Sequence, residues 1–113
     1  MQSWWLLRDG EVLATAEVAE TFSSRARGLL GRTGYEGAMV FPHTRSVHSL
    51  GMRFALDVAF LDTDLVVVDV VQLVPWRITL PRLRAQSVLE AQLGAFERWR
   101  LVTGDRIELR PCP

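Results

Sequence analysis

Apolar residues along this chain come in short runs that turn residues separate, a pattern typical of β proteins. The first two runs cover residues 3–8 and 11–18, and Asp9-Gly10 between them is a dipeptide that favours a tight hairpin turn. Later runs predict strands at 38–41, 46–50, 57–62, 65–74, 87–91 and 106–110. Thr63-Asp64 would turn the chain between the third and fourth of these later runs, and we expect that pair to form the central hairpin of the sheet.

Two segments differ from this strand pattern and predict helical structure. Residues 23–31 combine capping residues at the start with Gly31 at the end, which predicts one short helix. Residues 95–99 predict a helical turn, whereas Pro75 and Pro81 exclude a central strand between them and predict a loop or an edge segment. The pattern therefore predicts a mainly β fold. We expect a single compact β-sandwich or barrel-like domain over residues 1–113, with one short helix at about 23–31 and a helical turn near 95–99.

Length and composition are those of one ordinary globular domain. The chain has 113 residues, of which 49% are hydrophobic and 23% charged, so it can bury a core and does not resemble a disordered chain. The longest apolar run, residues 65–71, is interrupted by Asp69 and is far shorter than the roughly 20 residues of a membrane-spanning helix. The first residues lack the basic start and the apolar core of a signal peptide. We therefore expect a cytoplasmic protein with no membrane partner.

Residues that usually bind metals or cofactors are scarce. Cys112 is the single cysteine, which excludes an internal disulfide and a cysteine-rich zinc site. His43 and His48 lack the spacing of a helical metal site, and Pro42 prevents a regular helix there. The chain also lacks a glycine-rich phosphate loop, a nucleophile elbow and any lysine. The sequence therefore predicts no metal and no cofactor.

Charge is neutral overall but unevenly distributed along the chain. All thirteen basic residues are arginine, and they balance thirteen acids. Residues 37–56 carry two arginines and two histidines without an acid, and residues 70–89 carry three arginines without an acid. Neutral net charge argues against strong nonspecific nucleic-acid binding, which depends on phosphate contacts. The local excess of arginine instead predicts a site for a small anion, since guanidinium groups pair well with carboxylates and phosphates.

The closest grouping of chemically useful side chains is His48, Arg53 and Asp57, at the start of an apolar strand. If the intervening loop brings them together, Arg53 would hold an anion while His48 donates a hydrogen bond or acts as a base. The structural alternative is an ion pair between Arg53 and Asp57 that fixes the loop, with His48 bound to backbone groups. The sequence leaves both interpretations open.

A second group of cations lies on the predicted helix at 23–31. Arg25 and the amides at the start of that helix would form a cradle for a phosphate or a carboxylate. Arg27 is rotated by about 200° from Arg25 on a helix, so one of the two would point towards the sheet. Alternatively, the arginines form a solvated face with one ion pair to an acid. The candidate acids are Asp57, Asp62 and Glu90.

The order of four motifs resembles the domain of unknown function 192 family, a group of small prokaryotic proteins. The motifs are RARGLLGR at 25–32, GAMVF at 37–41, HSLGMRFALDVAFLD at 48–62, and VLE at 88–90 followed by Gly94 and Gly104-Asp105. The resemblance covers about residues 15–109 and implies a compact mainly β domain. Where many members carry tryptophan, methionine and lysine, this chain has Gly51-Met52-Arg53, so the cation is kept and an aromatic residue is lost. The resemblance implies no established activity, cofactor or catalytic residue.

Together these features predict a noncatalytic binding module for a small anionic ligand or a protein partner. The residues expected to form its site are Arg25, Arg27, His48, Arg53 and Asp57. A small hydrolase or isomerase that uses His48 and Asp57 is the first alternative, and it requires a hydrogen bond between these side chains beside an open pocket. A structural accessory protein is the second alternative, and it requires an exposed apolar patch without a pocket.

Overall fold

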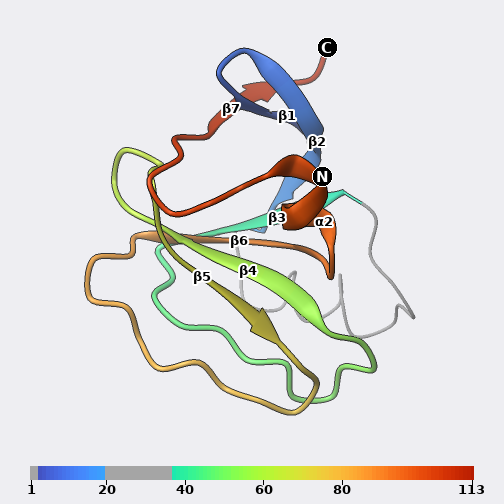
Figure 1. The fold of residues 1–113 in the computed structure, drawn as a ribbon, viewed down its shortest axis with the longest axis vertical. Helices are drawn as coiled ribbons and strands as arrows, with labels where there is room; N and C mark the ends of the chain where they lie inside the picture. The colour runs from blue at the N-terminus through green and yellow to red at the C-terminus, as the bar shows by residue number, and fades with distance from the viewer. Residues whose placement is uncertain (1–2, 20–36) are drawn as a thin grey trace.

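The computed structural model describes residues 3–19 and 37–113, which form seven strands and one short helix (Figure 1). The strands are β1 (Ser3–Arg8), β2 (Glu11–Val18), β3 (Ala38–Pro42), β4 (Leu56–Leu61), β5 (Val67–Leu73), β6 (Ser87–Gln92) and β7 (Glu108–Pro111), and the helix is α2 (Ala95–Trp99). The mainly β fold class is therefore confirmed, as is the helical turn near 95–99. The helix expected at 23–31 lies outside the described residues, together with Arg25 and Arg27.

The seven strands form one sheet in the order β5-β4-β6-β3-β2-β1-β7. Its two ends meet just before β5 and β7, where Val66 and Arg106 form an isolated antiparallel bridge. Next to this bridge, the Val67 amide donates to the Asp105 carbonyl oxygen at 2.8 Å. The sheet is thus closed at one corner, which gives it a barrel-like shape and removes part of its open edges.

One strand pair is parallel, and a glycine allows its close approach. β2 and β3 pair in parallel with Ala16 opposite Ala38, while the other described pairs are antiparallel. Gly37 leads into β3 with φ at +86°, and a Cβ atom there would lie 2.9 Å from the Thr15 carbonyl oxygen. Both the backbone conformation and the available space therefore require glycine at this position.

The central strands are buried on both faces, which explains their nearly continuous apolar sequence. All six residues of β4 are buried. Because side chains alternate along a strand, Ala59 and Leu61 join an inner cluster that the curved sheet encloses, while Val58 and Phe60 join an outer cluster on the opposite face. The outer cluster needs a cover of its own, since a bare apolar face would be exposed to water.

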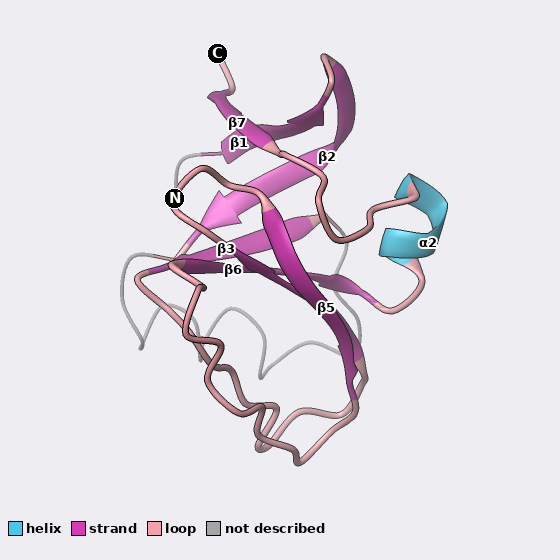
Figure 2. Cartoon of the chain, turned by 60° about the vertical axis from the view of Figure 1, so that its left-hand side comes forward, coloured by secondary structure: helices cyan, strands magenta, loops and turns pink. Residues whose placement is uncertain are grey.

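Two loops cover part of the outer cluster (Figure 2). We call residues 43–55 the histidine loop and residues 74–86 the tryptophan loop. They contribute Val47, Met52 and Ala85 to the outer cluster. Both views show the two loops side by side at the end of the molecule away from β7. The sheet therefore presents a paired loop surface at one end.

Two predictions about strands are wrong. Residues 46–50 do not form a strand, since only His48 pairs, in an isolated bridge with Ile78. This segment is held by hydrogen bonds of the Ser49 side chain instead of a regular ladder. The β4–β5 hairpin is also not central, because β5 is the first strand in the sheet order and β4 pairs on its other side with β6. That central pairing joins segments far apart in the sequence, which local patterns do not reveal.

The described residues form one compact globule. The Cα radius of gyration is 12.8 Å, close to the roughly 13 Å typical of a domain of 100 residues. No helix within residues 3–19 and 37–113 is both long and apolar enough to cross a membrane.

Candidate functional site

The histidine and tryptophan loops are joined by backbone hydrogen bonds along their length. The Ser49 amide donates to the Arg77 carbonyl oxygen at 2.8 Å, and the Thr79 amide donates to the Val47 carbonyl oxygen at 2.9 Å. Further along, the Arg82 amide donates to the carbonyl oxygen of Arg45 at 2.9 Å. Although neither loop is a regular strand, these bonds satisfy backbone groups that would otherwise be costly to bury. The pair is therefore an ordered surface.

Ser49 is the main side-chain link between the two loops. Its side chain is fully buried, and its Oγ donates to the Val74 carbonyl oxygen at 2.6 Å and accepts from the Arg77 amide at 2.9 Å. Thr79 makes a similar link, because its Oγ1 accepts from the Val47 amide at 3.0 Å. Buried hydroxyl groups with both a donor and an acceptor partner fix backbone geometry closely.

Replacing Ser49 with alanine is expected to lower the free energy of unfolding by about 2 kcal/mol, because the Arg77 amide and the Val74 carbonyl lose a buried partner. Urea unfolding measures this loss, and hydrogen exchange at the Arg77 amide should become faster. Ser46→Ala, in the same loop and only half-buried, is the matched control. Equal stability of the two variants would show that Ser49 does not hold the loops.

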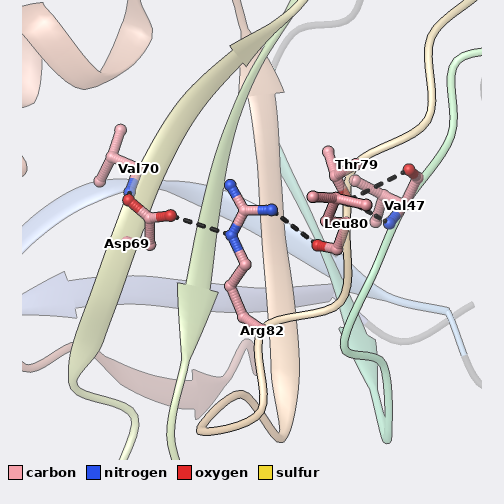
Figure 3. A network of polar contacts seen from close by, with 6 residues as sticks. All are labelled: Val47, Asp69, Val70, Thr79, Leu80 and Arg82. Carbon is pink, nitrogen blue, oxygen red and sulfur yellow. Dashed lines mark hydrogen bonds and ion pairs between the residues drawn. The ribbon is translucent and has the colours of Figure 1, made fainter.

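Arg82 anchors the tryptophan loop to the sheet (Figure 3). Its Nε donates to Asp69 Oδ2 on β5 at 2.9 Å, and its Nη1 donates to the Leu80 carbonyl oxygen at 2.6 Å. The guanidinium carbon also lies 4.6 Å from the centre of the Phe60 ring, within the range of a cation–π contact. Arg82 therefore has a structural role, and its charge is already paired with a carboxylate.

A pocket of about 370 Å³ opens between the two loops, mainly on the histidine loop. We call it the histidine pocket. Its lining consists of His43, Thr44, Arg45, Ser46, Val47, His48, Leu50 and Ile78. Both histidines of the chain are present, beside one arginine and two hydroxyl groups, and no acid contributes to the lining. The Thr44 hydroxyl already donates to the Pro42 carbonyl oxygen at 2.9 Å. Imidazole and guanidinium groups and the Ser46 hydroxyl are hydrogen-bond donors, so the lining is suited to an anion.

His48 and Arg45 are oriented by contacts with the backbone. The Leu50 amide donates to His48 Nδ1 at 3.3 Å, so the proton of a neutral His48 ring resides on Nε2. Arg45 Nε donates to the Ala85 carbonyl oxygen at 3.2 Å, and its two Nη groups make no hydrogen bond within the described ranges. Those Nη donors remain available to a ligand. The sequence predicts His48 as a site residue, whereas Arg45 has no such signal of its own.

Asp57 holds the start of α2 rather than facing the loops. It is only 3% exposed, and its Oδ2 accepts from the Gly94 amide at 2.9 Å and from the Phe96 amide at 3.1 Å. Its side chain shares the inner face of β4 with Ala59 and Leu61. A buried carboxylate that accepts two amide protons stabilises the turn into the helix. Asp57 is therefore buried with partners that the sequence did not reveal.

The structure does not bring His48, Arg53 and Asp57 together. Arg53 is exposed and makes no ion pair with Asp57, whose hydrogen bonds go to the α2 amides. His48 lies in the loop above the outer cluster, whereas Asp57 faces the inner one. Arg25 and Arg27 lie outside the described residues. Of the five residues predicted for the site, His48 is therefore the one that the pocket contains among those described.

Four polar lining residues were not singled out for anion binding from the sequence. They are His43, Thr44, Arg45 and Ser46, which follow directly after β3. The acid-free stretch at residues 37–56 was the signal that could have found them, because it includes all four. His43 was considered only as a metal ligand. Within residues 3–19 and 37–113, no group of three or more histidine, cysteine, aspartate or glutamate side chains is placed to hold a metal ion.

Two acids proposed as arginine partners have separate environments. Asp62 Oδ1 accepts from the Asp64 and Val66 amides at 2.8 and 3.0 Å, so it shapes the β4–β5 turn. Glu90 is buried on the outer face of β6, opposite Met39 and Val58 in the sheet register. Asp62 therefore stabilises the β4–β5 turn, whereas Glu90 is a buried acid on the outer face of the sheet.

A second, more polar pocket of about 420 Å³ lies near α2. Its lining includes Arg8, Arg98 and Arg100, but also Glu11. Arg8 is already committed, since its guanidinium donates to the Trp99 carbonyl oxygen at 2.6 Å and to the Arg100 carbonyl oxygen at 3.0 Å. An acid in the wall and a committed arginine make this pocket a weaker anion site than the histidine pocket.

Comparison with known proteins identifies relatives over most of the chain. A UPF0127 protein from Pyrococcus horikoshii is 37% identical over 105 residues, which cover 88% of each chain. A UPF0127 protein from Pyrococcus furiosus is 38% identical over 103 residues, covering 87% of this chain and 89% of that one.

Two solved structures share the fold. One, from Sinorhizobium meliloti, is described as a putative transcription regulator; it has a TM-score of 0.78 and 27% identity, and the match covers 96% of this chain and 92% of that one. A protein of unknown function from Novosphingobium aromaticivorans has a TM-score of 0.73 and 26% identity, covering 94% and 83% of the two chains. The DUF192 family model, described as an uncharacterised ACR, matches residues 5–109. This chain therefore belongs to the DUF192 family.

Proposed function

We propose that the protein is a noncatalytic binding module for a small anionic ligand, which it takes up in the histidine pocket. The observation that carries the proposal is the lining, which gathers both histidines and Arg45 without an acid. Its volume of about 370 Å³ is within the range of small-molecule sites. Arg45 would pair with the anion through its Nη groups, and the imidazole groups and the Ser46 hydroxyl would orient it.

Catalysis finds less support in the geometry than binding does. A hydrolase or isomerase built on His48 and Asp57 requires a hydrogen bond between them, whereas the Asp57 carboxylate binds the Gly94 and Phe96 amides on the other face of β4. The lining of the histidine pocket contains no acid that could act together with His48. A purely structural accessory role predicts no pocket, so it fits this lining less well.

The description of one of the two similar solved structures suggests nucleic acid as another class of ligand. The Sinorhizobium protein is described as a putative transcription regulator. Neutral net charge and equal numbers of acids and bases in this chain do not favour strong phosphate-backbone binding. We therefore retain a small anion as the proposed ligand and include a nucleotide among the probes.

Replacing Arg45 with glutamine is expected to weaken anion binding by at least about tenfold, because a charge-assisted contact is lost. Calorimetric titration with inorganic phosphate, a nucleoside monophosphate and a dicarboxylate measures the change in affinity. Arg98→Gln is the matched control, because Arg98 is also exposed but lies on α2. Arg53→Gln tests the sequence prediction for that residue in the same experiment. Equal loss in the Arg45 and Arg98 variants would contradict binding in the histidine pocket.

A further inference from the structure

The tryptophan loop exposes an unusual amount of apolar side chain. Trp76 is 63% exposed, Ile78 69%, Leu80 78% and Leu83 84%. Among the ten large hydrophobic residues that are exposed within residues 3–19 and 37–113, six belong to the two loops. These six are Leu50, Val74, Trp76, Ile78, Leu80 and Leu83. Large apolar side chains gathered in this way mark an interaction surface more often than scattered ones do.

Arginines alternate with these apolar residues along the same loop. Arg77 lies between Trp76 and Ile78, and the exposed Arg84 follows Leu83. No acid occurs in the sequence from residue 70 to residue 89, so the loop itself supplies no compensating negative charge. Asp69, the nearest acid before it, is already paired with Arg82. The tryptophan loop therefore exposes apolar side chains and positively charged side chains next to each other.

The loop projects its side chains and is held in place. Its base is fixed by the hydrogen bonds of Ser49 and by the contact of Arg82 with the Phe60 ring. The hydrogen bond from Arg82 to Asp69 also holds it (Figure 3). Exposures of 63–84% mean that the side chains of Trp76, Leu80 and Leu83 protrude from the protein. Ile78, which is 69% exposed, also lines the histidine pocket. A protruding apolar side chain needs a medium that can surround it. A lipid interface provides this, because tryptophan and leucine enter the boundary of the acyl chains while arginine remains among the phosphates.

We propose that the tryptophan loop docks this protein on the surface of an anionic lipid bilayer. Charge complementarity favours this occupant over a second copy of the chain, since a symmetric contact would oppose Arg77 and Arg84 with the same arginines. The sequence predicted no membrane partner because no segment can span a bilayer. Docking on the surface needs no spanning segment, only the exposed apolar and basic side chains that this loop has.

The test is co-sedimentation of the purified full chain with vesicles at low and high salt. Vesicles of phosphatidylcholine alone are compared with vesicles that also contain phosphatidylglycerol. We expect binding to the anionic vesicles that weakens as salt is raised. The double variant Trp76→Asp, Leu80→Asp should bind at least about tenfold more weakly. The double variant Arg77→Gln, Arg84→Gln should lose about fivefold for each arginine.

The control is Leu93→Asp, Val102→Asp, which places the same charges at exposed apolar positions outside the two loops. It should retain more binding than the loop variant. Absence of binding by the wild-type chain, or an equal loss in the control, would overturn the proposal and favour a protein partner for the loop. Trp76, Leu80, Arg77 and Arg84 do not line the histidine pocket. Phosphate binding by the same variants is therefore measured as well. It distinguishes a failure of the proposed membrane docking from a failure of the proposed anion site.

Discussion

Replacing Phe60 with alanine is expected to lower the free energy of unfolding by about 4 kcal/mol. Phe60 is fully buried in the outer cluster, between Asp69 of β5 and Val88 of β6 in the sheet register. The variant loses the apolar burial of a ring and leaves a cavity that the flanking strands cannot close. It also removes the ring beneath the Arg82 guanidinium. The tryptophan loop should therefore become more mobile as well.

Urea unfolding measures the loss, and amide hydrogen exchange in residues 77–84 reports on the loop. Phe60→Leu, which keeps most of the apolar volume, should cost clearly less. Leu93→Ala is the surface control, since Leu93 is exposed, and its effect should stay below about 1 kcal/mol. A cost of Phe60→Ala as small as that of the control would mean that the outer cluster contributes little to stability. The account of a second core under the loops would then be wrong.

Replacing Asp57 with alanine is expected to lower the free energy of unfolding by about 3 kcal/mol. The carboxylate accepts from the amides of Gly94 and Phe96, and both would lose a charged, buried partner. Asp57→Asn should cost less, because the amide oxygen can still accept from one of them. Urea unfolding again supplies the measurement, and circular dichroism checks that the β fold remains.

Asp64→Ala is the matched control for this variant, because Asp64 is exposed in the β4–β5 turn. Its effect should lie within about 0.5 kcal/mol. The experiment also separates two views of Asp57. If Asp57→Ala left stability unchanged but weakened anion binding, the residue would belong to a ligand site, as the sequence predicts, and its role at α2 would be minor.

Much of the local structure could be predicted from the sequence because it depends on short-range patterns. The hairpin at Asp9-Gly10 appears as β1 and β2 at the expected residues. The strand predicted at 57–62 is β4, shifted by one residue, and the helical turn predicted near 95–99 is α2. Turn dipeptides and apolar periodicity act over a few residues, so a single sequence carries enough information to locate these elements.

The arrangement of the elements depends on contacts that no local pattern contains. β6 pairs with both β3 and β4, and β2 pairs with β3 in parallel across a long connection. The strand predicted at 46–50 is a loop because Ser49 binds backbone groups 25 and 28 residues later. Long-range pairing of this kind decided which face of each strand is covered.

The difference between local patterns and long-range contacts also explains how much of the site could be predicted. His48 and the acid-free charge of its segment were visible in the sequence, and the pocket includes both. Asp57 stood nine residues from His48 in the sequence, but strand alternation directs it to the inner face of β4. Arg45 and Ile78 come together only because the two loops pair. The exposure of the tryptophan loop likewise depends on how the whole chain packs, so it could not be predicted from local sequence patterns.

The most direct test of the central claim is a two-dimensional amide NMR titration of the whole chain with inorganic phosphate, a nucleoside monophosphate and a dicarboxylate. Binding in the histidine pocket predicts saturable shifts at residues 43–48 and at Ile78 with at least one of these anions. A well-dispersed spectrum without saturable shifts there would contradict the claim. Shifts confined to the pocket around Arg8 and Arg98 would contradict it equally, since they would place the anion site at α2 instead.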